Sequence, residues 1–108
     1  MTLPKITHLQ FSVLTYLHDA EHPGRDLRQR LAELGMRRSG PAFYQLMSRL
    51  EDAGLVSGSY DQKIVDGQII KERFYSITQE GLTAWQATRD FYVETIRVTE
   101  HTTHPGEA

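Results

Sequence analysis

The dipeptide Asp66-Gly67 constrains the fold of this chain more than any other local feature. It separates two stretches, Leu55 to Val65 and Gln68 to Ile77, that are rich in valine, isoleucine, tyrosine and phenylalanine. Asp-Gly supplies the positive φ angles of a two-residue hairpin turn, and strand-forming segments on both sides make it a strong hairpin signal. The sequence therefore predicts one long β-hairpin over residues 55–77.

Helical periodicity predicts two helices before residue 36. In the first, from about Thr7 to Asp19, apolar residues recur every three or four positions. They are Ile6, Leu9, Val13 and Leu17, while Phe11 and Leu14 extend the apolar surface around the side. A helix that is apolar on more than one side needs cover on more than one side. The second helix follows the break at residues 22–24 and ends near Gly35, with Leu27, Leu31 and Leu34 facing inward.

A third helix is predicted immediately before the hairpin. Ser39 or Gly40 can cap it, and Pro41 suits the first helical position, where a missing N–H has no helical partner. Gly54 ends it. The residues expected to face inward are Phe43, Leu46, Met47, Leu50 and Ala53. Those expected to face outward are Tyr44, Gln45, Ser48, Arg49 and Asp52.

After the hairpin, Thr78 can cap a final helix that runs to about Thr99. Its apolar residues form two strips, Leu82-Trp85-Tyr92-Ile96 and Ala84-Phe91-Val98. Three helices, a hairpin and a long last helix predict a mainly α protein with a small β-hairpin, namely a winged helix-turn-helix with an appended dimerisation helix. We expect the winged domain over 1–77, the dimerisation helix over 78–100 and a flexible tail over 101–108.

Charge is unevenly distributed along the 108 residues. The net charge of −2 weighs against a generic polyanion binder. The segment from Arg25 to Arg49, however, contains six arginines and only two acidic residues, Asp26 and Glu33. Such a basic segment is either the footprint of a nucleic-acid site or a solvated helix face. No apolar run approaches the ~20 residues that cross a bilayer, and the N-terminal residues lack a secretory pattern. We therefore expect a cytoplasmic protein without a membrane partner.

Two segments resemble the PadR family of transcriptional regulators. The stretch from Tyr44 to Val56 resembles the family's recognition-helix segment, matching it at Tyr44, Arg49, Leu50, Glu51, Gly54 and Leu55. The stretch from Arg73 to Gly81 is similar to a second motif, in which an aromatic pair leads into Leu-Thr-x-x-Gly. The chain departs from the family at residues 24–27 and at Pro41-Ala42-Phe43, where a threonine that contacts DNA is often found. The resemblance implies a short-form, homodimeric winged-helix repressor, which in many members releases DNA when a small molecule binds near the dimer interface.

A winged helix places its third helix in the major groove. Gln45 can then pair with adenine and Arg49 with guanine, while Tyr44 and Ser48 reach phosphates. Arg37, Arg38 and Ser39 precede the helix N-terminus, which itself favours an anion. On the hairpin, Lys63 and Lys71 can grip the DNA, although Asp61, Asp66 and Glu72 lie beside them. The alternative is that these are ordinary exposed residues, with Arg49 bracing the fold near Glu51.

The final helix predicts a homodimer, because one winged domain is too small to cover its length and both of its strips. We expect the interface to contain Phe11, Leu14, Trp85, Phe91, Tyr92 and Ile96. Phe11, Trp85 and Tyr92 are also candidates for a pocket that binds a planar aromatic effector, although aromatic residues at this spacing are more often plain interface or core. A fold-back of the helix end within one chain is the alternative to a dimer.

The sequence does not favour catalysis or a metal site. It has no cysteine, no phosphate-cradling glycine loop and no nucleophile elbow. His18 and His22 have the spacing of a metal pair but no evident third ligand. We expect no enzyme, no cofactor and no metal. The leading hypothesis is a sequence-specific double-stranded DNA-binding transcriptional regulator on a roughly palindromic site; the alternative is a winged-helix protein-interaction module without DNA affinity.

Overall fold

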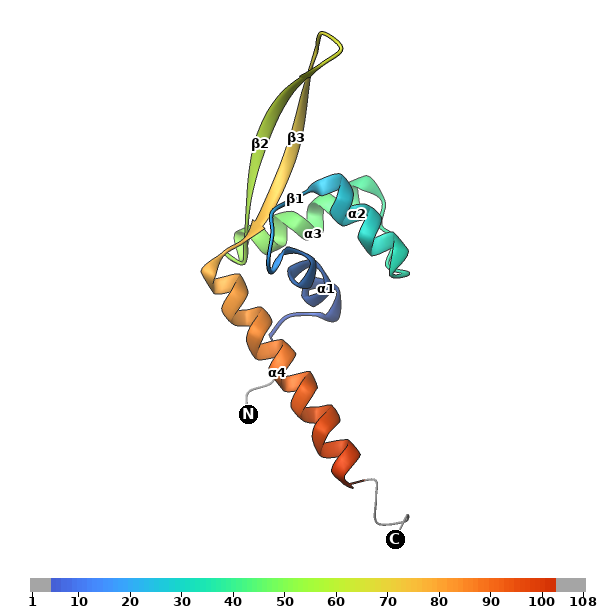
Figure 1. Cartoon of the computed structure of the whole chain (residues 1–108), viewed down its shortest axis with the longest axis vertical. Coiled ribbons are helices and arrows are strands. Elements are labelled where there is room, and N and C mark those ends of the chain that lie inside the picture. Colours follow the sequence, from blue (N-terminus) through green and yellow to red (C-terminus); the bar gives the residue numbers. More distant parts are fainter. Residues whose placement is uncertain (1–4, 103–108) are drawn as a thin grey trace.

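Three short helices enclose the core of the computed structural model, and the hairpin and the last helix project from it in opposite directions (Figure 1). The structure describes residues 5–102. Its elements are α1 (His8–Leu17), β1 (His22–Pro23), α2 (Gly24–Glu33), α3 (Gly40–Asp52), β2 (Val56–Val65), β3 (Gln68–Ile77) and α4 (Gln79–Thr102). The element order is the one expected for a winged helix-turn-helix with an appended helix.

Side-chain caps fix the starts of three helices. Thr7 and Gln10 form a reciprocal capping box at α1, each side chain accepting from the other's backbone N–H at 3.0 Å. Ser39 Oγ accepts from the Ala42 N–H at 3.3 Å, with Pro41 in the first turn of α3. Thr78 Oγ1 accepts from the Gly81 N–H at 3.0 Å at the start of α4. The caps predicted at Ser39 and Thr78 are thereby confirmed.

The hairpin is confirmed with its expected register. Val65 pairs with Gln68, and the turn residues Asp66 and Gly67 have φ of 52° and 76°, the left-handed values that a tight hairpin turn needs. The structure adds a strand that was not predicted. The two residues of β1 pair with β3, His22 opposite Tyr75, which makes a three-stranded antiparallel sheet in the order β1-β3-β2.

The core lies between α1, α2, α3 and the base of the sheet. Its buried apolar residues are Val13, Leu14, Leu17, Leu27, Leu31, Phe43, Met47, Leu50, Val56, Tyr75 and Trp85. Two inward assignments were wrong: Leu34 is 50% exposed and Ala53 is exposed, because each lies just past the last residue of its helix and leaves the helical face. Leu46 is only partly buried.

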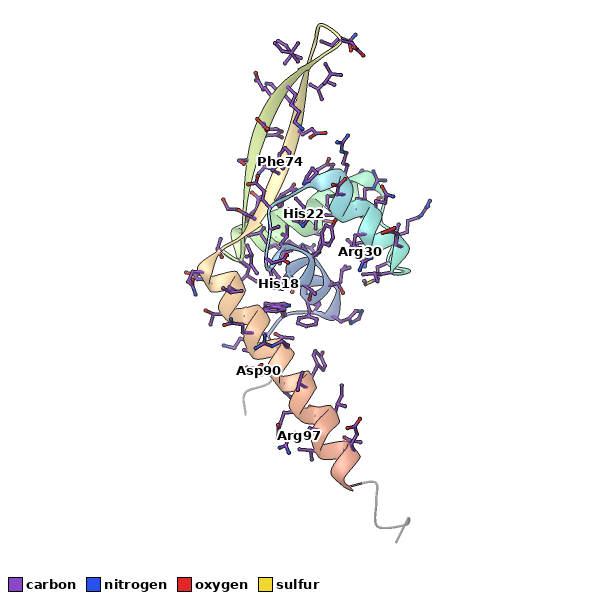
Figure 2. All side chains as sticks on the ribbon, viewed as in Figure 1. His18, His22, Arg30, Phe74, Asp90 and Arg97 are labelled. Atoms are coloured by element: carbon purple, nitrogen blue, oxygen red, sulfur yellow. The ribbon has the colours of Figure 1, made fainter. Side chains whose placement is uncertain are left out.

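Helix α4 packs on α1 over its first turns and then leaves the body. Trp85 Nε1 donates to Thr15 Oγ1 at 2.9 Å, and the Trp85 ring stacks on His18. The contact with α1 reaches Tyr92, whose ring lies against Phe11, and Arg97 marks the part that projects beyond it (Figure 2). The helix continues into His101 and Thr102, the first residues of the predicted tail; the rest of that tail lies outside the described residues. None of the helices described here has the length and apolarity to span a membrane.

Candidate nucleic-acid interface

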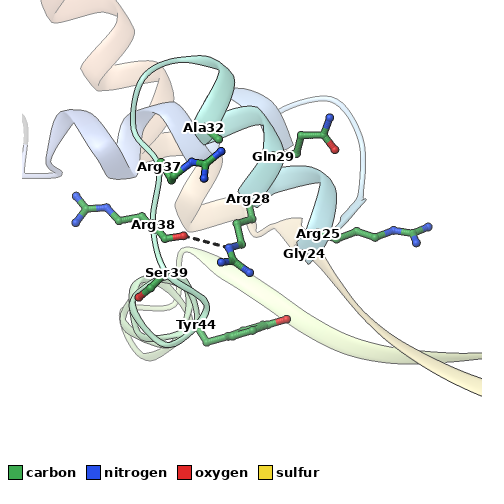
Figure 3. Close-up of a pocket in the computed structure, with 9 residues that line it drawn as sticks. All are labelled: Gly24, Arg25, Arg28, Gln29, Ala32, Arg37, Arg38, Ser39 and Tyr44. Atoms are coloured by element: carbon green, nitrogen blue, oxygen red, sulfur yellow. Dashed lines mark hydrogen bonds between the residues drawn. The ribbon is translucent and has the colours of Figure 1, made fainter.

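Four arginines gather around an open groove between α2 and the start of α3 (Figure 3). The groove has a volume of about 670 Å³. It is lined by Gly24, Arg25, Arg28, Gln29, Ala32, Arg37, Arg38, Ser39 and Tyr44, none of which carries an acidic side chain. The guanidinium groups spread along the rim and do not converge on one point, so the groove presents an extended positive surface.

The helical period of α2 places Arg25 and Arg28 on this side. Leu27 and Leu31 are buried in the core, so the opposite face of α2 is free for polar side chains. Arg28 Nε donates to the Arg38 carbonyl at 3.1 Å, a bond that joins α2 to the loop before α3 (Figure 3). Arg25 and Arg28 belong to the basic segment but are not among the residues predicted to bind DNA. Their three-residue spacing opposite the two buried leucines was the signal that could have identified them.

The N-terminus of α3 opens beside the groove. Ser39 caps it, and the free backbone N–H groups of a helix N-terminus carry a partial positive charge. The structure brings the predicted residues Arg37, Arg38, Ser39 and Tyr44 together here. No carboxylate of the described residues lies within 4.0 Å of the Arg37 or Arg38 guanidinium groups. These two charges are therefore available to an outside anion.

The outward face of α3 carries the other predicted contacts. Gln45, Ser48 and Arg49 are exposed, and Tyr44 is 52% exposed with its ring edge-on to Phe43. The alternative role for Arg49, bracing the fold near Glu51, is not what the structure has. Glu51 pairs instead with Arg73 of β3, with 2.9 Å between Arg73 Nη2 and Glu51 Oε2. The Arg49 side chain forms no hydrogen bond or ion pair within residues 5–102.

The structure separates the two lysines of the hairpin. Lys63 pairs with Ile70 and Lys71 with Gln62, so the two side chains point to opposite faces of the sheet. Lys63 Nζ lies 3.8 Å from Glu72 Oε2, and Arg25 Nη2 lies 3.0 Å from Glu72 Oε1. Glu72 thus offsets part of the positive charge near the base of the hairpin. The hairpin surface is mixed in charge.

The residues predicted for a dimer interface lie in different environments. Leu14 is fully buried in the core of its own chain and has no surface to offer a partner, which corrects its assignment to the interface. Trp85 is 8% exposed, with its ring stacked on His18 and under the Arg89 guanidinium. Phe11 and Tyr92 lie side by side, 5.9 Å between ring centroids. Phe91 is partly buried, and Ile96 is exposed.

The two histidines considered for a metal each stack on an aromatic ring. His18 stacks on Trp85, and His22 on Tyr16 with 4.1 Å between the ring centroids. Within residues 5–102, no three or more histidine, cysteine, aspartate or glutamate side chains gather in a way that could hold a metal ion.

Solved structures share this fold. No protein-family model matches the sequence, and no curated protein matches it. A PadR family transcription regulator from Clostridium difficile R20291 has a TM-score of 0.73 at 14% identity, over 90% of this chain and 99% of that chain. A PadR family transcriptional regulator from Eggerthella lenta has a TM-score of 0.67 at 24% identity, over 90% of this chain and 82% of that chain.

A third solved structure contains nucleic acid. Bacillus subtilis PadR in complex with operator DNA has a TM-score of 0.58 at 21% identity, over 81% of this chain and 49% of that chain. The similarity to these three structures covers 81% to 90% of this chain. The chain therefore has the winged-helix fold seen in PadR-family regulators.

Proposed function

We propose that this chain is a sequence-specific double-stranded DNA-binding transcriptional regulator of the PadR type that acts as a homodimer. The observation that carries this proposal is the groove of four arginines beside the N-terminus of α3. Helix dipole, backbone N–H groups and guanidinium charges all favour an anion at this one place. Because the guanidinium groups are spread along the rim, the groove suits successive phosphates of a backbone better than one small anion.

The face of α3 next to this groove supplies base recognition in the proposal. Its exposed side chains include Gln45 and Arg49, and these types pair well with adenine and guanine in the major groove. Neither side chain is engaged by another described residue. With the groove arginines on one phosphate backbone, α3 would lie along the major groove with these side chains toward the bases. Lys63 and Lys71 contribute less, since they point to opposite faces.

The homodimer rests on the projecting half of α4. Its exposed apolar side chains are Tyr92 at 41%, Val93 at 57%, Ile96 at 57% and Val98 at 45%. A row of apolar side chains on a helix that leaves its own domain needs a second surface to cover it. A twofold pairing would present two α3 helices about 34 Å apart, which requires a roughly palindromic site.

Repression relieved by an aromatic effector is the finer part of the proposal. Phe11, which is partly buried, and Tyr92, which is 41% exposed, offer an aromatic pair near the surface, whereas Trp85 is already covered by His18 and Arg89. A planar ligand between subunits would stack on that pair and displace His18 to reach Trp85. We predict that such a ligand quenches Trp85 emission and raises the melting temperature by mass action. Ligands that bind while leaving both Trp85 emission and DNA affinity unchanged would argue against this role.

The decisive experiment is selection of bound duplexes from a random pool at low salt. We expect recovery of a roughly palindromic site. Because phosphate contacts release counterions, binding should weaken steeply as salt rises. Failure to recover any duplex at low salt would overturn the proposal and favour a winged-helix module that binds protein.

A further inference from the structure

One ion pair joins the recognition helix to the hairpin. Arg73 Nη2 of β3 donates to both carboxylate oxygens of Glu51 in the last turn of α3, at 3.0 and 2.9 Å. The two side chains are only 25% and 28% exposed. The hydrogen bond to Glu51 is the main reason that the pKa of Arg73 is raised above its ordinary value.

The surroundings of this pair leave it little freedom. The Arg73 guanidinium lies 4.9 Å from the ring centroid of Tyr60 and 5.5 Å from that of Tyr75. Gly58 lies against the pair on β2. A Cβ at residue 58 would sit 2.6 Å from Arg73 Nη2 and 2.9 Å from Glu51 Oε1, distances that real side chains do not adopt. A side chain at residue 58 would therefore push the two charged groups out of their present arrangement.

The pair lies at the point where the hairpin leaves the body, so it can set the direction of the whole projecting part. Every residue from Ser59 to Lys71 is exposed, so the hairpin leaves the body just beyond Arg73. The turn lies six residues away, or about 20 Å at the rise of a β-strand. On the opposite face of β3, Glu72, itself only 13% exposed, reaches Arg25 through one contact of 3.0 Å, but the Arg25 side chain is 73% exposed and water competes for its guanidinium group. The Glu51–Arg73 pair is therefore the stronger tie.

We propose that Glu51 and Arg73 are positioning residues that fix the direction of the wing, residues 59–71, relative to α3. The proposal rests on the proposed function in one respect: a set direction lets α3 and the wing meet one duplex at a fixed spacing. Without the pair, the wing would keep its strand register but swing about its base. The contact of α3 with the duplex and that of the wing would then no longer reinforce each other.

Spin-label distances test the wing direction without DNA. The chain has no cysteine, so Gln29→Cys and Gln68→Cys place labels only on α2 and beside the turn. Labelled chains are diluted into unlabelled protein so that the distances measured lie within one chain. We expect a narrow distribution for the parent, a broad one for Arg73→Ala and a narrower one again for Glu51→Arg with Arg73→Glu. Arg97→Ala, which removes an ion pair on α4, should leave the distribution narrow.

An unchanged distribution in Arg73→Ala would overturn the proposal. If that variant does not fold, Glu51→Gln keeps the shape of the side chain and removes its charge. It should broaden the distribution to a lesser degree, and no broadening would equally overturn the idea.

Duplex selection then tests the consequence for recognition. Arg73→Ala should keep the preference at base pairs under α3 and lose it at the pairs that the wing reaches. Retention of the full preference would contradict the proposed role. If the parent protein binds no duplex at all, the proposed function fails, while the spin-label result still decides whether the pair directs the wing.

Discussion

Arg37 and Arg38 stand at the point where the groove meets the N-terminus of α3, and no described carboxylate neutralises either side chain. Charges of this kind contact phosphates whatever the base sequence, and each contact releases about one counterion. We expect Arg37→Ala with Arg38→Ala to weaken binding to every duplex and to lower the slope of log affinity against log salt by about two. Fluorescence anisotropy over a salt series measures both.

The control removes the same charge elsewhere. Arg30 and Arg97 pair with Glu33 and Glu94 within their own helices, away from the groove. Their joint replacement by alanine should leave the salt slope nearly unchanged. Equal slopes for the two double variants would show that net charge, and not the groove, sets the affinity.

Gln45 has a different role in the proposal from that of the arginines. Its exposed amide on α3 can pair bidentately with adenine, and a good contact of that kind discriminates by ~1–3 kcal/mol. Gln45→Ala should therefore relax the preference at one or two base pairs while leaving the salt slope intact. Duplex selection with the variant measures this, and Gln86→Ala on α4 is the control. An intact preference in Gln45→Ala would mean that α3 does not read bases through this residue.

At the scale of elements, the sequence predicted what local patterns encode. The hairpin, the caps at Ser39 and Thr78, and the faces of α1 to α3 follow from turn chemistry and periodicity. Strand β1 was missed because two residues are too few to show alternation. The Glu51–Arg73 pair was missed because its partners are 22 positions apart and only the folded hairpin brings them together. The groove was half predicted, since Arg25 and Arg28 join it only when α2 packs against α3.

The junction between the sheet and α4 depends on a glycine. A Cβ at Gly81 would lie 2.0 Å from the carbonyl oxygen of Leu55, the residue before β2, and 2.8 Å from Ile77 Cγ1, so the backbone of α4 lies very close to the start of β2. Gly81→Ala must push the first turn of α4 outward. We expect the free energy of unfolding to fall by about 1–3 kcal/mol or more, as in other overpacked sites. Urea unfolding measures it.

Gln86→Ala serves again as the matched variant, because it adds no contact on an exposed face of the same helix. Its free energy of unfolding should stay within about 0.5 kcal/mol of the parent. A Gly81→Ala protein as stable as the parent would mean that α4 does not dock this closely.

At the scale of the whole molecule, the chain is far more extended than a compact domain of its length. It measures 70 × 26 × 23 Å with a radius of gyration of 17.6 Å, where a compact chain of this length has about 13 Å. The predicted alternative, a fold-back of the helix end, is not adopted, since α4 runs unbroken to Thr102. The extension comes from the hairpin at one end and from α4 at the other (Figure 1).

The homodimer prediction follows from the apolar residues on the C-terminal half of α4. Phe91 lies on one apolar strip of the helix and is partly buried, Ile96 lies on the other and is 57% exposed, and a partner surface that covers both strips would bury both residues. An aspartate buried in such an interface loses its hydration without gaining a partner, which costs far more than the contact contributes. We therefore expect Phe91→Asp with Ile96→Asp to convert a dimer to a monomer and to abolish DNA binding. Light scattering at micromolar concentration measures the mass.

The matched control adds the same two charges at exposed positions nearer the start of α4. Thr83 and Gln86 are exposed there, and Thr83→Asp with Gln86→Asp should keep the dimer mass. Because Trp85 is held by Thr15 and His18 within one chain, its emission should report an intact winged core in both variants. A monomer mass for the parent chain would refute the dimer, and with it the argument for a palindromic site, since one α3 helix alone imposes no twofold symmetry on the DNA.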